Sequence, residues 1–536
     1  MRRSHGRNRD GLEIARRARR LRAPPVRGAH RIGGGAVPAH GDARPLSFSH
    51  HPGSGGKPRD ILSSRRLDFA FARFALFLPT MPATKSIAVL GAGVTGLTAA
   101  HRLVQGGHRV RVFERSGRIG GAIRTERTDG WLVESGPNTL LSGKPGLAAL
   151  LDELGLADER VDATPTAKQR FIVRGGRLVP APLSPPAFLT SRLFSPFAKA
   201  RVLAEFLVRP RGRATDLSLA SFIRAHFGQE FVDYALNPFV AGVYAGDPQQ
   251  LSARHAFPQL WELERRQGSL LRGQIALARA RRARGEAAPV VFSFRHGLQT
   301  LIDALAARLP AGALTLNAGI ETLMPGEPWN IVWQDAAGTR TESFDAVVAA
   351  VPAPALGQLR FGSLGERPLV ALGAMEQPPV ASLFLGFRRE QVAHPLDGLG
   401  LLVPAVESRN VLGILFSSTL FPGRAPAGHV ALTLLAGGMR QPALAALSAP
   451  ELFARVRSDL ADLLGVTGEP VFLRHTAWPR AIPQYQLGHE KFLAAMAECE
   501  AGHPRLFIGG QARDGVAVTA CIAAGEKLAQ RAAEAS

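Results

Sequence analysis

One glycine-rich turn restricts the possible folds of this chain more than any other feature. The sequence GAGVTG at residues 91–96 follows four apolar residues, 87–90, and precedes a helical pattern at 97–105 that a pair of glycines closes. A second apolar strand is predicted at 109–113, and Glu114 ends it about 20 residues after the turn. A strand, a GxGxxG turn, a helix and an acidic residue after the next strand predict a dinucleotide-binding α/β fold.

Each glycine of this turn has a physical reason. Gly91 permits the tight bend, Gly93 lets the backbone approach a pyrophosphate, and Gly96 lets the helix pack closely on the strand. The positive end of the helix dipole faces the phosphate charge. Glu114 would accept hydrogen bonds from ribose hydroxyl groups, whereas an NADP site would favour a cation at that position.

The length and composition are those of a globular protein with more than one domain. A chain of 536 residues is too long for a single hydrophobic core, and a typical domain size of roughly 150 residues predicts two to four domains. The two cysteines, Cys499 and Cys521, form no CxxC pair, so neither a disulfide framework nor a zinc site is expected. No apolar run approaches the roughly 20 residues that span a bilayer, because Arg73 interrupts residues 69–78.

More than half of the net charge of +22 lies in the first 80 residues, which hold 17 Arg and Lys against 5 Asp and Glu. No basic helix with interleaved aromatic residues follows, so nucleic-acid binding is not expected. Residues 1–80 are predicted to be disordered, as a basic arm or a transit peptide. They could also result from an upstream start, with Met81 as the true first residue, and we favour this interpretation.

A second glycine-rich segment selects FAD among the dinucleotides. The sequence ERSGRIGG at residues 114–121 resembles the second glycine motif of the amine-oxidase-like flavoproteins. The resemblance implies that Arg118 places a positive charge near the pyrophosphate. It also implies that Gly120 and Gly121 let the chain pass beside the flavin.

Four further segments, in the order and spacing of one family, narrow the resemblance. They are ESGPNTL at 134–140, NPFVAGVYAGDP at 237–248 with Leu251 and Ser252 after it, IPQY at 482–485, and Gly509-Gly510 with DGVAV at 514–518 and Cys521-Ile522. Together they resemble the oxygen-dependent protoporphyrinogen oxidases over residues 85 to 535. One such motif arises by chance, whereas four in register do not.

The resemblance implies an FAD-dependent oxidoreductase of haem biosynthesis that converts a porphyrinogen to the aromatic porphyrin. Protoporphyrinogen IX would be oxidised to protoporphyrin IX in three flavin cycles, each of which turns one dioxygen into hydrogen peroxide. Three alternatives stay open. They are the oxidation of coproporphyrinogen III to coproporphyrin III, an amine or carotenoid oxidoreductase of the same superfamily, and a non-catalytic porphyrin carrier that keeps FAD as a structural element.

The resemblance also implies which positions contact the cofactor and the substrate. Asn138 is expected to position the substrate, without a general base or a metal ion. Apolar residues suit a flat macrocycle, and the ring would lie against Leu399, Gly400, Leu402 and Leu435. The expected FAD contacts are Gly91, Gly93, Val94, Thr95, Gly96, Glu114, Arg115, Arg118, Gly121, Ala122, Gly136, Pro137, Asn138, Thr139, Ile320, Trp478, Val516, Ala517 and Val518.

One position departs from the family pattern. Some members carry an arginine that holds a substrate propionate in the loop after the first hairpin, and the alignment places Ser184 there. The propionate contact is therefore open, with Arg174, Arg177 and Arg192 as nearby candidates.

The expected fold class is α/β, or α+β overall: a Rossmann-like FAD-binding domain with an inserted mixed-sheet substrate domain and a helical subdomain. The apolar, basic and proline-rich stretch 180–262 would form amphipathic helices that pack on another domain or lie on a membrane. We expect a cytoplasmic monomer or homodimer, peripheral on the inner face of the cytoplasmic membrane. The expected divisions are 1–80 as the leader, 82–170, 272–360 and 490–536 as three parts of the FAD-binding domain, 171–262 as the helical subdomain, and 361–489 as the substrate-binding domain.

Overall fold

Five parallel strands form the sheet that follows from the glycine-rich turn. A computed structural model describes residues 84–143, 146–209 and 215–535, so the predicted leader lies outside the described residues. The strand order is β10-β2-β1-β14-β21. Their bounds are Ser86–Leu90 (β1), Arg109–Phe113 (β2), Leu314–Thr315 (β10), Ala346–Ala349 (β14) and Leu506–Ile508 (β21). The central strands are buried on both faces, which explains their continuous apolar sequences IAVL and AVVA.

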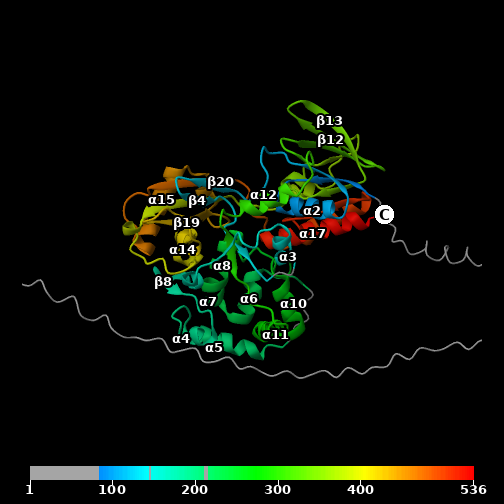
Figure 1. Cartoon of the computed structure of the whole chain (residues 1–536). Helices are drawn as coiled ribbons and strands as arrows, with labels where there is room; N and C mark the ends of the chain where they lie inside the picture. Colours follow the sequence, from blue (N-terminus) through cyan, green and yellow to red (C-terminus); the bar gives the residue numbers. More distant parts are fainter. Residues whose placement is uncertain (1–83, 144–145, 210–214, 536) are drawn as a thin grey trace, which may run out of the picture. The chain divides into compact units, whose positions relative to one another are not determined.

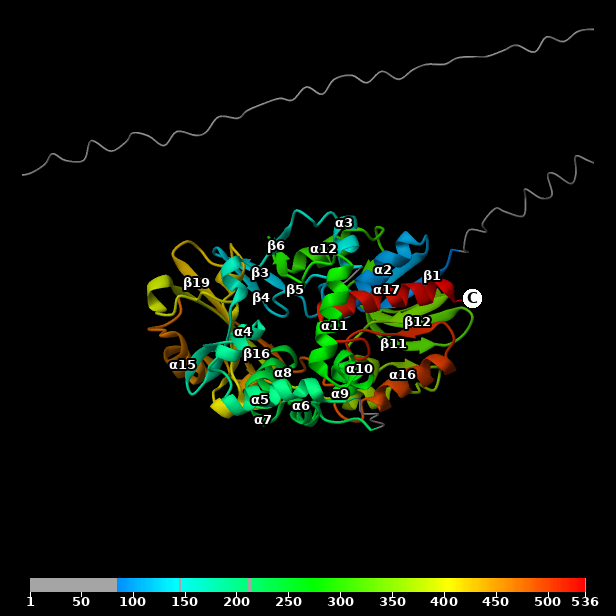
Figure 2. The same cartoon turned by 90° about the horizontal axis from the view of Figure 1, so that it is seen from below.

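Two helices from opposite ends of the described chain lie side by side on this sheet. They are α2 (Val94–Gln105) and α17 (Val518–Glu534), drawn in blue and red in Figures 1 and 2. A Cβ on Gly525 would lie 2.5 Å from the Thr95 carbonyl oxygen, so the close approach of the two helices requires glycine there. Strand β21, from the end of the described chain, lies beside β14 at the edge of this sheet.

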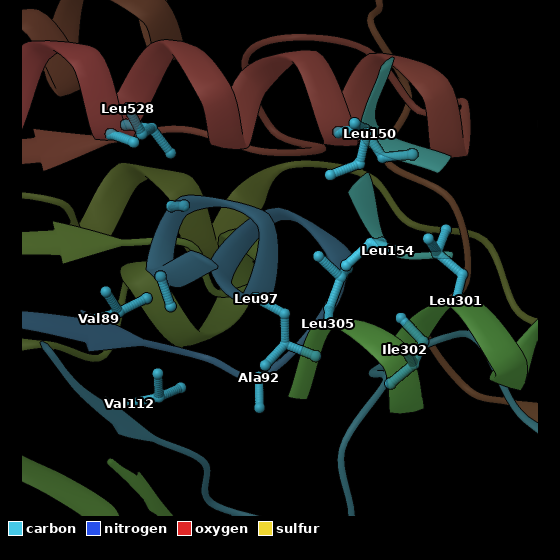
Figure 3. Close-up of a cluster of buried hydrophobic side chains, with 14 of the residues drawn as sticks. Val89, Ala92, Leu97, Val112, Leu150, Leu154, Leu301, Ile302, Leu305 and Leu528 are labelled. Carbon is cyan, nitrogen blue, oxygen red and sulfur yellow. The ribbon is translucent and has the colours of Figure 1, made fainter. Parts of the chain in front are cut away.

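The core beneath these helices combines segments that are far apart in the sequence. Helices α3 (Leu147–Glu153) and α12 (Gln299–Ala307) supply leucines to the same cluster as β1 and α2. Figure 3 shows this packing for Val89, Ala92, Leu97, Val112, Leu150, Leu154, Leu301, Ile302, Leu305 and Leu528. The cluster fixes the first dinucleotide unit against the inserted segment around α12.

A second, four-stranded sheet packs on the other side of the parallel sheet. Its order is β13-β12-β11-β15, with bounds Gly338–Phe344, Trp329–Asp335, Gly319–Met324 and Arg360–Phe361. Trp329 and Trp333 of β12 are buried in the core that this sheet shares with β1 and β14. Helix α16 (Glu490–Gly502), which the sequence patterns did not predict, buries Phe492 and Met496 in that core.

The largest sheet has seven strands in the order β20-β16-β19-β18-β17-β7-β8. Their bounds are Phe472–Trp478, Val380–Arg388, His429–Gly437, Val411–Leu415, Gly400–Leu402, Arg170–Arg174 and Arg177–Pro180. One face packs on α15 (Ala449–Leu464), whose amphipathic pattern and capping box at Ser448 and Glu451 the sequence shows plainly. Strands β7 and β8 form a hairpin that turns at Gly175 and Gly176, and β7 pairs with β17 of this sheet.

Short helices fill the stretch between this hairpin and residue 284. They are Pro185–Thr190 (α4), Pro196–Ala204 (α5), Leu219–Phe227 (α6), Gln229–Phe231 (α7), Asn237–Tyr244 (α8), Ala253–Ala256 (α9), Pro258–Gln267 (α10) and Leu270–Ala283 (α11). Serine side chains cap the first turns of α4, α5, α6, α9 and α11, which is a strong local start signal. Helix α11 was not predicted, because only Leu270 and Gly273 are buried along its basic sequence. In the described parts of the chain no helix is long and apolar enough to span a bilayer.

Candidate functional site

The glycine-rich turn sits at the carboxyl end of β1, where ligands bind in parallel α/β sheets. Gly91 has φ +99°, and a Cβ there would lie 2.9 Å from the Ala350 carbonyl oxygen. A Cβ on Gly96 would lie 1.9 Å from the Gly91 carbonyl oxygen. Around Gly93, in contrast, no protein atom lies within 4 Å of an added Cβ. The fold itself therefore requires Gly91 and Gly96, while Gly93 leaves space that a bound phosphate group would use.

Glu114 directly follows β2 and closes the turn from the side. Its Oε2 accepts a hydrogen bond of 2.9 Å from the Ala92 amide, and its Oε1 accepts from the Ser116 amide and hydroxyl at 2.9 and 2.8 Å. These bonds use three of the roughly four acceptor positions of a carboxylate. The remaining position and the partial exposure of Glu114 fit a ribose hydroxyl donor.

Arg118 brings a positive charge to this edge, next to Glu114. The guanidinium donates to the carbonyls of Ile119 and Ile123 at 3.1 Å and to the Gly121 carbonyl. Among the described residues no acidic side chain lies within ion-pair distance of Arg118, and burial lowers the pKa of the guanidinium. A partly buried cation with no described carboxylate within ion-pair distance fits the charge of a pyrophosphate.

The second glycine segment and the last helix complete the same edge. Gly120 forms a bridge with Gly93, and a Cβ on Gly121 would lie 3.3 Å from the Gly93 Cα. The first turns of α2 and α17 both begin without a side-chain cap, so their amides remain available for a ligand. A Cβ on Gly510 would lie 3.7 Å from the Thr95 hydroxyl oxygen, so the loop before α17 meets the first turn of α2. The residues present fit FAD at this edge.

The segment that ends at Asn138 joins this edge to the seven-stranded sheet. A Cβ on Gly136 would lie 2.0 Å from the Ala122 carbonyl oxygen, so this strand end passes directly over the second glycine segment. Trp478 of β20 donates its indole Nε1 to the Ser135 carbonyl at 3.0 Å. The Asn138 side-chain amide donates to the Gly136 carbonyl at 3.0 Å. Trp478 and Asn138 are both partly exposed beside this junction.

Two of the predicted ring-binding leucines lie in one row across the sheet. Leu402 of β17 pairs with Gly413 of β18, and Gly413 pairs with Leu435 of β19. Both leucines are partly exposed, and a Cβ on Gly242 of α8 would lie 2.6 Å from Leu402 Cδ2. The row and α8 therefore form an apolar surface on the sheet face opposite α15.

The remaining predicted positions have other neighbours. Leu399 is partly buried with Leu420 and Phe421, next to the sheet. Gly400 has φ +149°, and its added Cβ would lie 2.2 Å from the Ile414 carbonyl oxygen, so packing alone requires glycine there. Ile320 packs at the border of the four-stranded sheet, and Arg115 is exposed. Direct contacts of all these residues with FAD or substrate remain predictions.

A small cavity beside Asn138, with both polar and apolar lining, was not predicted from the sequence. It has room for about one water and is lined by Leu132, Glu134, Asn138, Phe384, Ser417, Leu420, Phe421 and Arg424. Glu134 accepts hydrogen bonds from the Thr125 hydroxyl at 2.7 Å and the Leu298 amide at 2.8 Å. Burial raises the pKa of Glu134 to about 7, although Thr125, Arg424 and Leu298 act against the rise. The sequence contains Glu134 in its ESGPNTL segment, but nothing in the pattern indicates its burial.

Arg174, one of the three candidate propionate contacts, has another role in the described structure, and so does Ser184. Arg174 forms an ion pair of 2.7 Å with Glu230 and lies over the Tyr234 ring, and Ser184 caps α4. Sequence patterns missed Arg440, whose guanidinium donates to the Val403 carbonyl and the Asn237 side chain at 3.0 Å. In the part of the chain that the structure describes, no carboxylate forms an ion pair with Arg440, and burial lowers its pKa.

Known proteins share this sequence and this fold. The family model of flavin-containing amine oxidoreductases matches residues 94–533. The chain belongs to this family. As a member it is a flavin-dependent oxidoreductase, and FAD is its cofactor.

Individual relatives agree over most of the chain. A mitochondrial protoporphyrinogen oxidase of Nicotiana tabacum is 34% identical, with 82% of this chain and 93% of the relative covered. A coproporphyrinogen III oxidase of Staphylococcus aureus is 28% identical, with 83% and 98% covered. A crystal structure from Exiguobacterium sp. 255-15 superimposes with a TM-score of 0.71 at 24% identity, covering 84% of this chain and 99% of that one, which shows a shared fold.

Proposed function

We propose that this flavoenzyme oxidises a porphyrinogen to the aromatic porphyrin with dioxygen, and that protoporphyrinogen IX is its substrate. The observation that carries the proposal is the hydrogen bond between Trp478 and Ser135. It holds the sheet with Leu402 and Leu435 against the loop that passes over the second glycine segment. An apolar surface beside a flavin turn suits a large, flat and mostly apolar substrate.

For this reaction the protein mainly has to orient the macrocycle against the flavin. Six electrons and six protons leave the macrocycle, and three dioxygen molecules take them up as three molecules of hydrogen peroxide. Bound FAD supplies the two-electron acceptor for each of these steps. Leu402 and Leu435 would hold the ring in contact with the flavin and exclude water, while Asn138 would fix its rotation through a polar contact.

Coproporphyrinogen III is the second candidate substrate, because the Staphylococcus aureus relative is named for its oxidation. The tobacco relative, named for protoporphyrinogen, is the more similar of the two at 34% against 28% identity. The two substrates differ in that two vinyl groups of one replace two propionates of the other. A second cationic side chain that binds a propionate would therefore matter more for coproporphyrinogen, and Arg440 is available for this role.

Purified, FAD-loaded protein mixed with each porphyrinogen in air tests the proposal. We expect porphyrin fluorescence to rise with hydrogen peroxide release, and faster with protoporphyrinogen. The same mixture without protein is the control for spontaneous oxidation in air. Equal rates for the parent and this control with both substrates would contradict catalysis and favour a porphyrin carrier.

We further propose that the enzyme works at a membrane surface of the cytoplasm, as a monomer or a homodimer. Helices α4 and α5 lie along the lower edge of the helical region in Figure 1. Phe197 of α5 is 83% exposed, and Leu207, in the 3-10 turn that follows α5, is 81% exposed. Leu183, Leu189 and Leu203 are also more than half exposed, and Lys199 and Arg201 lie among them. Exposed apolar side chains with nearby cations fit the interface of an anionic bilayer.

Flotation with anionic liposomes tests this location. We expect the protein to float, and the double variant Phe197→Ser, Leu207→Ser to remain at the bottom with its FAD content unchanged. Binding that high salt abolishes would assign it to the cations alone, because salt screens charges but not apolar contacts. A parent protein that stays at the bottom at low salt would contradict the proposal.

A further inference from the structure

The Tyr485 hydroxyl closes the loop that leads into α17. It donates a hydrogen bond of 2.6 Å to the Gln511 carbonyl and accepts one of 2.8 Å from the Gly515 amide. Gly515 has φ +119°, a conformation that few other residues adopt. The Asp514 carboxylate accepts from the Gly510 amide at the start of the same loop. The Asp514 carboxylate thus holds the start of the loop, and the Tyr485 hydroxyl holds its end.

Tyr485 itself is fixed by its surroundings. It is 4% exposed, and its ring stacks on His489 with centroids 4.2 Å apart. Neither ring nitrogen of His489 has a hydrogen-bond partner among the described residues, and burial lowers its pKa to about 4, so the ring is a neutral packing surface at pH 7. The Tyr485 carbonyl accepts from the Ser252 amide at 2.8 Å, and the Gln484 side chain donates to the Tyr244 carbonyl at 2.8 Å. The IPQY segment is therefore held from the helical region.

The loop held by this hydroxyl carries the predicted flavin contacts at 516–518. Val516 packs against the same core as Tyr485 and the helices α6, α8 and α9. Loss of the hydroxyl would leave the Gln511 carbonyl and the Gly515 amide without their partner in a partly buried position, which destabilises this loop conformation. The first turn of α17, which begins without a side-chain cap, would shift with it.

We infer that Tyr485 is a positioning residue for the flavin: its hydroxyl fixes the loop that sets residues 516–518 and the start of α17 against the cofactor. The inference rests on the proposed place of FAD at this edge, and it does not depend on which substrate the enzyme oxidises. It gives the IPQY segment a role in cofactor binding, transmitted from the helical region to the dinucleotide-binding sheet.

The variant Tyr485→Phe tests the inference, because it keeps the ring and its stacking and removes only the hydroxyl. We expect FAD to bind at least tenfold more weakly, and the visible flavin absorption bands to shift. The matched control is Tyr244→Phe, which removes another buried hydroxyl, one that donates to the Ala256 carbonyl within the helical region. This control should keep the FAD affinity and the flavin spectrum of the parent.

Equal FAD affinity and equal spectra for the two variants would overturn the inference. Hydrogen exchange of the parent apoprotein gives a second test that does not depend on a folded variant. We expect the Gly515 amide to be protected even without FAD, because its partner is a protein hydroxyl. If the Gly515 amide exchanges as fast as an amide in an open loop, the inference about Tyr485 is equally overturned. Neither measurement involves porphyrinogen, so failure of the proposed oxidation would be visible separately.

Discussion

The Glu134 carboxylate and the Arg424 guanidinium are buried together, with Oε1 and Nη2 3.9 Å apart. Arg424 also donates to the Ser293 hydroxyl at 2.7 Å, while its Nη1 has no hydrogen-bond partner among the described residues. The pair lines the cavity beside Asn138. A long, incompletely bonded ion pair does not offset the cost of burying the carboxylate, which explains its raised pKa.

This raised pKa predicts how stability depends on pH. Between the usual value of 4.5 and about 7, folded Glu134 holds a proton that the unfolded chain has released. The free energy of unfolding therefore falls as pH rises through this window, by at most about 3 kcal/mol from this group. Glu134→Gln should remove that contribution. Unfolding by urea at pH 4.5 and 7.5 measures it, and an unchanged difference between the two pH values in the variant would refute the assignment.

Gly93→Val should abolish FAD binding without unfolding the protein. The space around Gly93 is free of protein atoms, so a side chain fits there in the absence of the cofactor and blocks the pyrophosphate in its presence. Gly96→Val is the contrasting variant, and it should fail to fold because its Cβ meets the Gly91 carbonyl. Flavin absorbance and circular dichroism distinguish these outcomes. A folded Gly93→Val protein as yellow as the parent would contradict the site.

Leu402→Arg should reduce turnover at least about 100-fold while FAD stays bound. A charge placed against the apolar ring of the substrate lacks a partner, and burying it costs several kcal/mol. Leu401→Met, on the opposite face of the same strand, is the control and should keep most of the activity. Turnover of Leu402→Arg within a few-fold of the parent would show that the row of Leu402 and Leu435 does not line the substrate site.

Asn138→Ala should lower kcat while fold and FAD content stay close to those of the parent. Among the described residues the side chain has one hydrogen bond, to a carbonyl two residues away, so little stability depends on it. Its predicted contribution is the polar contact that orients the macrocycle. Steady-state rates and flavin absorbance measure the two effects. Loss of FAD together with activity would show that Asn138 holds the cofactor instead.

Arg440→Gln should raise KM for a porphyrinogen more than it lowers kcat. Glutamine keeps a donor for the Val403 carbonyl but removes the charge that a substrate carboxylate would meet. The rise should be larger for coproporphyrinogen, which has four propionates, than for protoporphyrinogen, which has two. An equal KM for the parent and the variant with both substrates would show that Arg440 does not bind a propionate.

The dinucleotide-binding edge could be predicted from the sequence because its constraints are local. The turn at 91–96 and the strands on either side of it depend on backbone geometry and on continuous apolar runs, which are visible in a single segment. The start of α17 at Val518 follows from the same kind of pattern. Local signals of this type survive folding because no distant residue has to supply them.

Features that depend on distant partners could not be predicted in this way. The pKa of Glu134 is raised because folding buries its carboxylate, and the neighbours Thr125 and Arg424, which also come from distant segments, act against that rise. The hairpin β7–β8 joins the sheet of β17, more than 200 residues away, although its neighbours in sequence are helices. Helix α11 has too few buried apolar residues to give a helical period, and its serine cap is its main local signal.

The place of β21 beside β14 has a consequence for how the protein is made. More than 400 residues separate β1 from β21, and a ribosome that adds about 5 to 20 residues per second needs roughly 20 to 80 seconds to synthesise them. Until then the edge of β14 has no partner, and α2 lacks the helix that covers it. The cofactor site is thus begun by the first described strand to emerge and completed only by the last.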